Sequence, residues 1–316
     1  MQIIDGKTIS KNIRQEIKYA LQNDKFKTIP VPHLVVIQVG DNPASEVYIR
    51  NKKKACEEVG IKFSHYHYKE EVPEDKLIEV VERLSNTPTV TGILVQLPLP
   101  DHINKENVIE AINPDKDVDG FTTTQAGMLQ LGMINKRRLL PCTAKGIVTL
   151  LEESTDTLVG KRVTVIGRSN IVGKPVAQLL QEKHATVTLC HSRSNNIEEY
   201  TQKSDIVVLA TGQAQYFDAR YFYNTKKDLI IIDAGINRDE NGKLCGDLNK
   251  SYIEECNKDP RKNNWKYTPV PGGVGPMTIA MLISNIYIAH ENQFDYIWNY
   301  CKNRQISEAA LNNIKD

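Results

Sequence analysis

A tyrosine and a lysine stand four residues apart in the segment SEVYIRNKKKACEEVG, whose pattern predicts a helix. Side chains at this spacing share one helix face, so Tyr48 and Lys52 are expected to lie side by side. A phenol beside an amine can orient a proton transfer, which makes the pair a candidate acid/base centre. The same spacing would also arise on an exposed helix face, because Lys52 opens a run of consecutive lysines.

Three further features place polar groups where a ligand could meet them. Gln96 ends the apolar run VTGILVQL, a poor position for a core residue and a good one at a strand-end cleft. Asp119 lies in DKDVDG, where Gly120 frees the backbone to present the carboxylate. PGGVGP (271–276) exposes backbone amides just before a predicted helix, which suits a polar or anionic ligand. The aspartates near Asp119 lack a spaced ligand set, so no metal site is predicted.

The stretch VTVIGRSNIVGKPVAQLL has the pattern of a dinucleotide-binding turn. A β-branched run ends at Gly167, a short polar loop follows, and Gly173 opens a helix whose amides can meet a phosphate. The usual middle glycine is missing, and Ser169 or Asn170 stands in its place. The loop is therefore expected to take a wider path around the ligand.

The strand after this turn ends in TLCHSRS, without the carboxylate that an NAD site uses to hold the ribose hydroxyls. His191, Ser192 and Arg193 stand there instead. With Arg168 and Ser169 they would form a basic, hydroxyl-rich pocket suited to a 2′-phosphate. The sequence therefore favours NADP. The alternative is that these residues are solvated loop positions.

Strand-like and helix-like segments alternate almost throughout, which predicts an α/β protein with parallel sheets. We expect two α/β domains. The first spans 1–120, and the second, a Rossmann-like doubly wound domain, spans 121–275. An apolar helix at 276–300 would pack back on the first domain. The polar segment CNKDPRKNNWKY (256–267) is predicted to be a surface loop.

Composition limits the classes of partner. The 316 residues include 40 basic and 39 acidic side chains, a net charge of +1, so no global field draws the chain to nucleic acid or to a membrane. The six scattered cysteines are typical of small core residues in a reducing compartment. The N-terminal segment lacks the apolar core of a signal peptide. A cytoplasmic location is expected.

Seven segments together resemble the bifunctional methylenetetrahydrofolate dehydrogenase/cyclohydrolase family. They occur in the family's order along nearly the whole chain: NPASEVYIRNKKKACEEVGI, GILVQLPLP, NPDKDVDGF, PCTAKGIVTLL, GRSNIVGKP, INRDENGKLCGDL and TPVPGGVGPMTIAML. The resemblance implies a homodimer of one-carbon metabolism whose two α/β domains flank a cleft, with a tetrahydrofolate derivative in that cleft and NADP on the second domain. It implies oxidation of 5,10-methylenetetrahydrofolate to the 5,10-methenyl compound, then hydrolysis to 10-formyltetrahydrofolate.

The resemblance also implies roles for individual residues. Tyr48 would stack on the pterin, Lys52 would be the acid/base group, Gln96 would support Lys52, and Asp119 would hydrogen-bond the pterin. The substrate wall would add Val95, Leu97, Pro271, Gly272, Gly273, Val274 and Gly275. The dinucleotide would meet Gly167, Arg168, Ser169, Ile171, Gly173, Ser192, Arg193, Gly212 and Ile236.

These roles suit the two steps. Hydride transfer needs mainly alignment of donor and acceptor. Hydrolysis needs a proton acceptor and then a donor, which one lysine can provide. A methenyl cation beside Lys52 would favour the neutral amine, because like charges repel.

Two other functions are compatible with parts of this pattern. A shikimate- or amino-acid-type NADP dehydrogenase would share the two-domain plan but would not need Gln96, Asp119 or the glycines of 271–276. A non-catalytic folate- or nucleotide-binding protein would be expected to lack Tyr48 or Lys52, and the chain has both.

Overall fold

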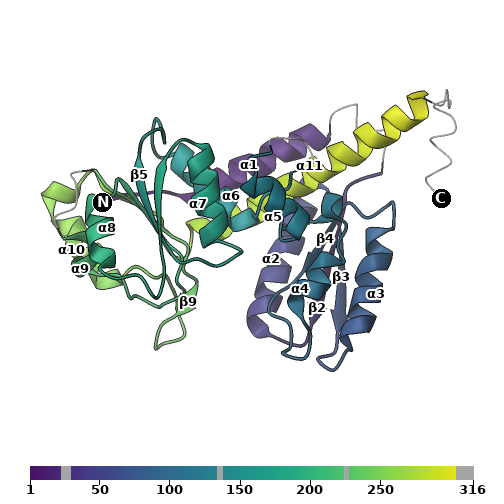
Figure 1. Ribbon diagram of the computed structural model, residues 1–316, viewed down its shortest axis with the longest axis horizontal. Coiled ribbons are helices and arrows are strands. Elements are labelled where there is room, and N and C mark those ends of the chain that lie inside the picture. The colour runs from purple at the N-terminus through teal and green to yellow at the C-terminus, as the bar shows by residue number, and fades with distance from the viewer. Residues whose placement is uncertain (23–29, 134–137, 224–227, 304–316) are drawn as a thin grey trace. The chain divides into compact units, whose positions relative to one another are not determined.

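The computed structural model of the protein describes residues 1–22, 30–133, 138–223 and 228–303. The chain divides into two compact units. Unit 1 consists of residues 1–11 and 141–281, and unit 2 of residues 12–140 together with the chain from 282 onward. Each unit contains a parallel sheet with helices beside it (Figure 1), which confirms the predicted α/β fold class.

Unit 2 is built on a parallel sheet with the order β3-β2-β4 among its described residues. Its strands are β2 (His33–Val39), β3 (Lys62–Tyr68) and β4 (Gly92–Val95). Every residue of β2 and β4 is buried, as expected for β-branched runs that are covered on both faces. The edge strand β3 alternates between exposed and half-buried residues. The carboxyl ends of β2 and β4 are therefore firmly packed, and they fix the positions at which the loops after these strands begin.

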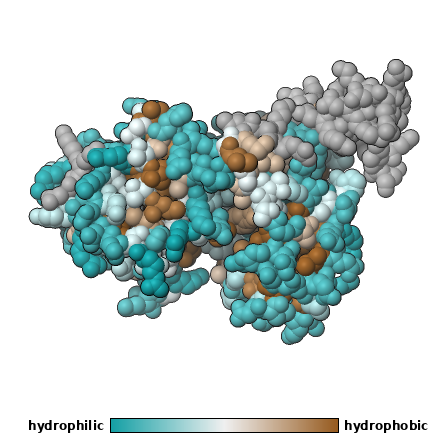
Figure 2. Space-filling model, viewed as in Figure 1, coloured by the Kyte–Doolittle hydropathy of each residue, from teal (hydrophilic) through white to brown (hydrophobic). Residues whose placement is uncertain are grey.

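Helices cover this sheet and hold its core in place. Their bounds are α1 (Gly6–Leu21, which begins in unit 1), α2 (Pro43–Val59), α3 (Glu74–Ser85), α4 (Lys105–Glu110) and α5 (Thr123–Gln130). Leu77 and Val81 of α3 and Val108 of α4 pack with Ile37 and Ile93 of the strands. On the face drawn in Figure 2, hydrophilic side chains cover most of each unit and apolar ones show between them.

Unit 1 contains a longer parallel sheet, with the order β1-β11-β8-β7-β5-β6 among the described residues. Its strands are β1 (Gln2–Ile3), β5 (Arg162–Ile166), β6 (Thr186–Cys190), β7 (Ile206–Leu209), β8 (Ile230–Asp233) and β11 (Lys266–Tyr267). The helices are α6 (Cys142–Glu152), α7 (Gly173–Glu182), α8 (Ile197–Lys203), α9 (Ala219–Phe222) and α10 (Lys250–Lys258), and β9 (Asn237–Arg238) pairs with β10 (Leu244–Cys245).

The strand order of unit 1 reverses at β5. The next strand along the chain, β6, lies on one side of β5, and the strand after that, β7, lies on the other. Such a reversal marks the point where open α/β sheets bind ligands, beyond the carboxyl ends of the strands. The predicted doubly wound sheet is confirmed, and the loop after Ile166 lies at this reversal.

The compact units divide the chain differently from the predicted domains at three places, one of which is residues 276–281, which lie in unit 1 and not with the predicted first domain. Residues 1–11 lie in unit 1, because Gln2 and Ile3 pair with Lys266 and Tyr267 in the sheet. Residues 121–140 lie in unit 2. There the side chain of Gln125 donates to the Pro114 carbonyl at 2.8 Å and accepts from the Leu139 amide at 2.7 Å.

The C-terminal helix α11 (Val274–Asn303) packs on the predicted first domain, as expected. The side-chain amide of Asn285 donates to the carbonyls of Val118 and Leu140, both at 2.8 Å. Two helical turns further on, the side chain of Gln293 donates to the Val90 carbonyl at 3.3 Å. In the described part of the chain, neither α11 nor any other helix is long and apolar enough to cross a membrane.

The cysteines largely follow the expectation of core residues. Among the described residues, Cys56, Cys142, Cys190 and Cys256 are buried thiols outside any disulfide, and Cys245 is a half-buried one. The side chain of Cys301 lies outside the described residues.

The segment 256–267 is not the surface loop predicted from its polar composition. It contains the end of α10, the 3-10 helix η3 (Pro260–Lys262) and β11. Cys256 and Trp265 are fully buried or nearly so, at 0% and 2% exposed. The prediction was wrong because a few well-spaced apolar residues fold this stretch against the sheet, while its many polar residues face outward.

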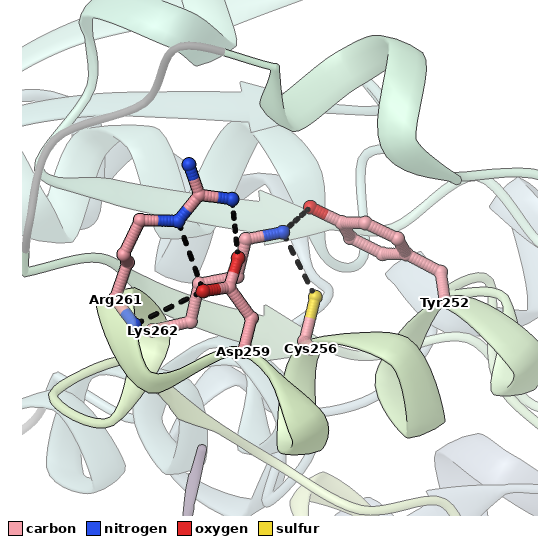
Figure 3. A network of polar contacts seen from close by, with 5 residues as sticks. All are labelled: Tyr252, Cys256, Asp259, Arg261 and Lys262. Carbon is pink, nitrogen blue, oxygen red and sulfur yellow. Dashed lines mark hydrogen bonds and ion pairs between the residues drawn. The ribbon is translucent and has the colours of Figure 1, made fainter.

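Lys262 lies at the centre of this segment (Figure 3). Its ammonium group lies 4.7 Å from the ring centroid of Tyr252 and 4.8 Å from that of Trp265. It also donates to the Tyr252 hydroxyl at 3.2 Å and contacts the Cys256 sulfur at 3.3 Å. The pKa of Asp259 falls to about 2, because Arg261 donates two hydrogen bonds to its carboxylate.

We expect Lys262→Ala to lower the free energy of unfolding by about 1–2 kcal/mol, because it removes two cation–π contacts at a half-buried site. Urea unfolding followed by tryptophan fluorescence measures this directly, since Trp265 lies against the lysine. Lys258→Ala is the matched control: Lys258 is an exposed lysine at the end of the preceding helix, α10, and this variant should unfold as the wild type does. Equal midpoints for the two variants would contradict the prediction.

Candidate active site

The structure brings Lys52 and Gln96 into direct contact within unit 2. The Lys52 ammonium donates to the Gln96 side-chain oxygen at 3.0 Å. Lys52 is half-buried, whereas its neighbours Lys53 and Lys54 are exposed. The lysine run is therefore not a uniform solvated face. Tyr48, one helical turn before Lys52, is half-buried as well.

The contact is fixed from both sides. Helix α2 begins where the Asn42 side chain accepts from the Ala44 amide at 2.9 Å, and it ends at Gly60 in the left-handed region. The Gln96 amide continues the parallel ladder by donating to the Ile37 carbonyl at 2.8 Å. Its side-chain nitrogen donates to the Leu97 carbonyl at 2.7 Å. The side-chain oxygen of Gln96 is thus the atom left to receive the lysine.

Asp119 lies in a loop that is held on both sides. Asp117 forms a parallel bridge with Ile93 of β4, so the chain runs on beside that strand toward its carboxyl end. The Asp117 carboxylate accepts from the Gly120 amide at 2.9 Å and from the Thr122 amide at 2.7 Å. Burial raises the pKa of Asp117 to about 6. Asp119 itself is half-buried. It lies between Val118, whose carbonyl accepts from Asn285, and Gly120, whose amide donates to Asp117.

The predicted nucleotide turn follows β5 in unit 1. Gly167 has φ 118°, and a Cβ there would lie 2.1 Å from the Ala210 carbonyl oxygen. At Gly173, the first residue of α7, a Cβ would lie 1.8 Å from the Gly167 oxygen. The hydroxyl oxygen of Ser169 accepts from the Val172 amide at 3.1 Å. Strand, turn and helix therefore pack backbone against backbone, which leaves a cradle open toward solvent that fits a dinucleotide phosphate.

The basic residues that favoured NADP lie at one edge of the sheet. In the pairing of β5 with β6, Ile166 lies opposite Cys190. Arg168 and Ser192 each follow two residues later, so both stand just beyond the carboxyl ends of these strands. Both are exposed, as is Arg193. No carboxylate occurs among residues 191–194. The arrangement fits the 2′-phosphate of NADP better than the free ribose hydroxyls of NAD.

The remaining cofactor candidates belong to three neighbouring loops. Gly212 follows β7 and is exposed; Ile236 follows β8 and is 51% exposed. Ile171, which is also exposed, lies in the turn before α7. All of them stand at the carboxyl ends of paired strands or just beyond. The structure thus gathers the cofactor candidates at one edge of unit 1.

The glycine-rich segment 271–275 lies in unit 1, just before and at the start of α11. A Cβ on Gly273 would lie 2.6 Å from the Thr268 side chain, and Gly6 packs against the carbonyl of Gly273. The segment is therefore rigidly packed. The other substrate candidates, Tyr48, Lys52, Val95, Gln96, Leu97 and Asp119, lie in unit 2. That the two groups face one shared cleft stays a prediction.

Sequence reasoning missed the residues that hold these loops. Asp117 and Asn285 bracket Asp119, and Asp233 and Asp247 hold the loops after β7 and β8. One signal was present: an aspartate three residues before a glycine often accepts from that glycine's amide. Contacts between residues far apart in the chain, such as Asn285 with Val118, leave no local pattern.

Known proteins with similar sequences decide the family. The catalytic-domain model of the tetrahydrofolate dehydrogenase/cyclohydrolase family matches residues 4–119, and its NAD(P)-binding-domain model matches residues 141–294. The chain belongs to this family. The bifunctional protein FolD of Brevibacillus brevis is 46% identical over 92% of this chain and 98% of its own length.

Solved structures of other family members share the fold. The FolD methylenetetrahydrofolate dehydrogenase/cyclohydrolase of Campylobacter jejuni has a TM-score of 0.85 and 41% identity over 92% of this chain and 99% of its own. The Trypanosoma brucei enzyme, solved with NADP and an inhibitor, has a TM-score of 0.81 and 32% identity over 92% of this chain and 97% of its own. The predicted family, its pair of activities and its nicotinamide cofactor are confirmed.

Proposed function

We propose that the protein oxidises 5,10-methylenetetrahydrofolate to 5,10-methenyltetrahydrofolate with NADP and hydrolyses that product to 10-formyltetrahydrofolate. The observation that carries this proposal is the contact between Lys52 and Gln96 at the carboxyl end of β4. It lies in the part of the chain that matches the family's catalytic domain. A shikimate-type dehydrogenase would not need Gln96 beside the lysine.

For the first step, the residues of the site bind and align the folate. NADP, when bound, supplies the hydride acceptor. Tyr48 offers an aromatic face one turn from Lys52, and the Asp119 carboxylate, held by its flanking peptides, can accept from a pterin N–H. Gly167, Gly173 and the basic strand ends hold the dinucleotide. Alignment of the two reacting carbons accounts for much of the rate, because it removes the entropy cost of their encounter.

For the second step, Lys52 handles the protons. As water attacks the methenyl carbon, the neutral amine accepts a proton from it. The resulting ammonium then donates a proton to the ring nitrogen that leaves as the ring opens. Gln96 accepts a hydrogen bond from the ammonium and so keeps Nζ aimed in one direction through both transfers. Its own amide is fixed by the Leu97 carbonyl, so it turns little between the two states.

A single assay tests the proposed function. Purified protein is mixed with 5,10-methylenetetrahydrofolate and NADP, and reduced nicotinamide and methenyltetrahydrofolate are followed at their separate absorbances. We expect NADPH to form and the methenyl compound to be consumed faster than it hydrolyses without protein. A parallel sample with shikimate as substrate should form no NADPH. Failure to reduce NADP with the folate would overturn the proposal.

The choice between NADP and NAD can be tested at Arg168. We expect Arg168→Ala to lower kcat/KM for NADP by roughly tenfold to a hundredfold, because a charge-assisted contact to the 2′-phosphate is lost. The value for NAD should change little. Arg162→Ala is the matched control, since Arg162 is an exposed arginine at the opposite end of the same strand. An unchanged NADP-to-NAD ratio in Arg168→Ala would contradict the role.

The resemblance to the family supports two further proposals. We infer that the protein is a homodimer with its tetrahydrofolate substrates as its small-molecule partners, and that it works in the cytoplasm. Sedimentation equilibrium should give a mass twice that of the chain. A concentration-independent mass equal to one chain would exclude the dimer.

A further inference from the structure

Asp247 lies at the centre of a buried network in unit 1, and the steps above give it no role. Its side chain is fully buried. Its Oδ2 accepts from the Thr211 amide at 2.7 Å, from the Thr211 hydroxyl at 2.8 Å and from the Gly212 amide at 3.1 Å. Its Oδ1 accepts from the side-chain nitrogen of Asn237 at 2.9 Å. Charge-assisted hydrogen bonds of this kind are among the strongest a protein makes.

The groups that Asp247 holds belong to two loops at the edge where the cofactor candidates gather. Strands β7 and β8 are paired in parallel, so the loops that follow them leave the sheet at the same edge. Gly212, in the first loop, is itself bound by Asp247. Ile236, in the second loop, directly precedes Asn237. Gly212 and Ile236 are themselves exposed. The buried carboxylate of Asp247 beneath them therefore sets the distance between the two loops.

The same carboxylate acts on the nucleotide turn. The Thr211 amide points at Asp247, and because a trans peptide is planar, the Ala210 carbonyl points the opposite way. That oxygen packs against Gly167 so closely that a Cβ there would lie 2.1 Å from it. Asp247 therefore fixes a peptide plane against which the turn after β5 is packed.

A second carboxylate holds Asp247 in turn. Asp233, at the end of β8, accepts from the backbone amides of Gly235, Asp247 and Leu248 at 2.9, 3.0 and 2.9 Å. A Cβ on Gly246 would lie 1.9 Å from Asp233 Oδ2, and a Cβ on Gly235 would lie 2.2 Å from Asp247 Oδ1. The two aspartates and the two glycines leave no slack in which the loops could shift.

We infer that Asp247 is a positioning residue for the dinucleotide: it holds the loops after β5, β7 and β8 in the arrangement in which Gly167, Gly212 and Ile236 meet the cofactor. This inference rests on the proposed function, because it takes that edge of unit 1 as the NADP site. Asp247 itself is fully buried and acts only through the loops. Its loss should therefore weaken NADP binding and leave folate chemistry at Lys52, in unit 2, unaffected.

The test compares three variants with the wild type. Asp247→Ala should raise the Kd for NADP by roughly thirtyfold or more, because four donors lose a charged acceptor. Asp247→Asn keeps the shape but not the charge and should raise it by about tenfold. Asn237→Ala removes one donor and should raise it by about threefold. Glu240→Gln, an exposed acid in the neighbouring hairpin, is the control and should bind NADP as the wild type does.

Two measurements separate positioning from general damage. Direct titration with NADP gives the Kd, and hydrolysis of methenyltetrahydrofolate without dinucleotide should stay within about twofold of wild type in every variant that folds. A wild-type Kd in Asp247→Asn and Asn237→Ala would overturn the inference even if Asp247→Ala fails to fold. Equal losses of NADP binding and of hydrolysis would also overturn it. A wild-type protein that binds no NADP would instead overturn the proposed function, before any variant is compared.

Discussion

Replacing Lys52 with methionine is expected to slow methenyltetrahydrofolate hydrolysis by roughly a hundredfold or more, since a positioned acid/base group contributes about that much. Methionine keeps an unbranched side chain of similar length, so packing on α2 should survive. What is lost is the amine that accepts and then donates the proton, together with its contact to Gln96 at 3.0 Å. The dehydrogenase step should fall less, because it depends mainly on alignment.

The matched control is Lys53→Met. Lys53 is the next residue, its side chain is 58% exposed, and its ion pair with Glu57 at 3.9 Å contributes little. Both variants are assayed for loss of methenyl absorbance and for NADPH formation, after circular dichroism has shown that they fold. Hydrolysis by Lys52→Met at the wild-type rate would show that the acid/base role lies elsewhere.

The contact between Lys52 and Gln96 was implied by the family resemblance, and local patterns predicted only the two elements that carry these residues. A helix face is set by spacing along a few turns, and a buried strand is set by a β-branched run. Lys52 lies in the middle of one such element, the helix α2, and Gln96 directly follows the other, the strand β4. Only their mutual contact is long-range, and the order of parallel strands, with β4 beside β2, produces it.

Where the pairing partner is distant and the segment short, the sequence does not indicate which strand the segment pairs with. Gln2 and Ile3 form only a two-residue strand, and their partners Lys266 and Tyr267 lie at the other end of the chain. The prediction for the segment 256–267 failed for a different reason. Its polar composition hides the few buried apolar side chains, Cys256, Trp265 and Tyr267, that pack it into the core of unit 1.

The candidate site shows the same division. Most of the residues proposed to touch ligands follow strands or stand in glycine-rich turns, which are visible in the sequence; that they touch ligands stays a prediction. The residues that hold them, such as Asn285 and Asp247, are buried polar groups whose partners come from other elements. A buried carboxylate or amide is stable only when such partners satisfy it. Its role can therefore be read only once the fold has brought the partners together.

The close packing at Gly173 leads to the second large expected effect. Gly173→Ala should abolish measurable NADP binding and lower the free energy of unfolding by about 2–3 kcal/mol, the upper part of the range typical of overpacking. The new Cβ would lie 1.8 Å from the oxygen and 2.5 Å from the carbon of Gly167. These are backbone atoms that cannot rotate aside, so either α7 must move away from β5 or the turn must open. Either shift displaces the helix N-terminus from the phosphate.

Gly127→Ala provides the control for the same substitution in a helix. Gly127 lies in α5, and a Cβ there would meet nothing within 4 Å. That variant should be more stable than the wild type by about 0.5–1 kcal/mol, because alanine loses less conformational freedom in a helix. Thermal unfolding and NADP titration of both variants would show opposite changes in stability and a loss of binding in only one. If Gly173→Ala bound NADP with the wild-type Kd, the turn after β5 would not be where the dinucleotide phosphates lie.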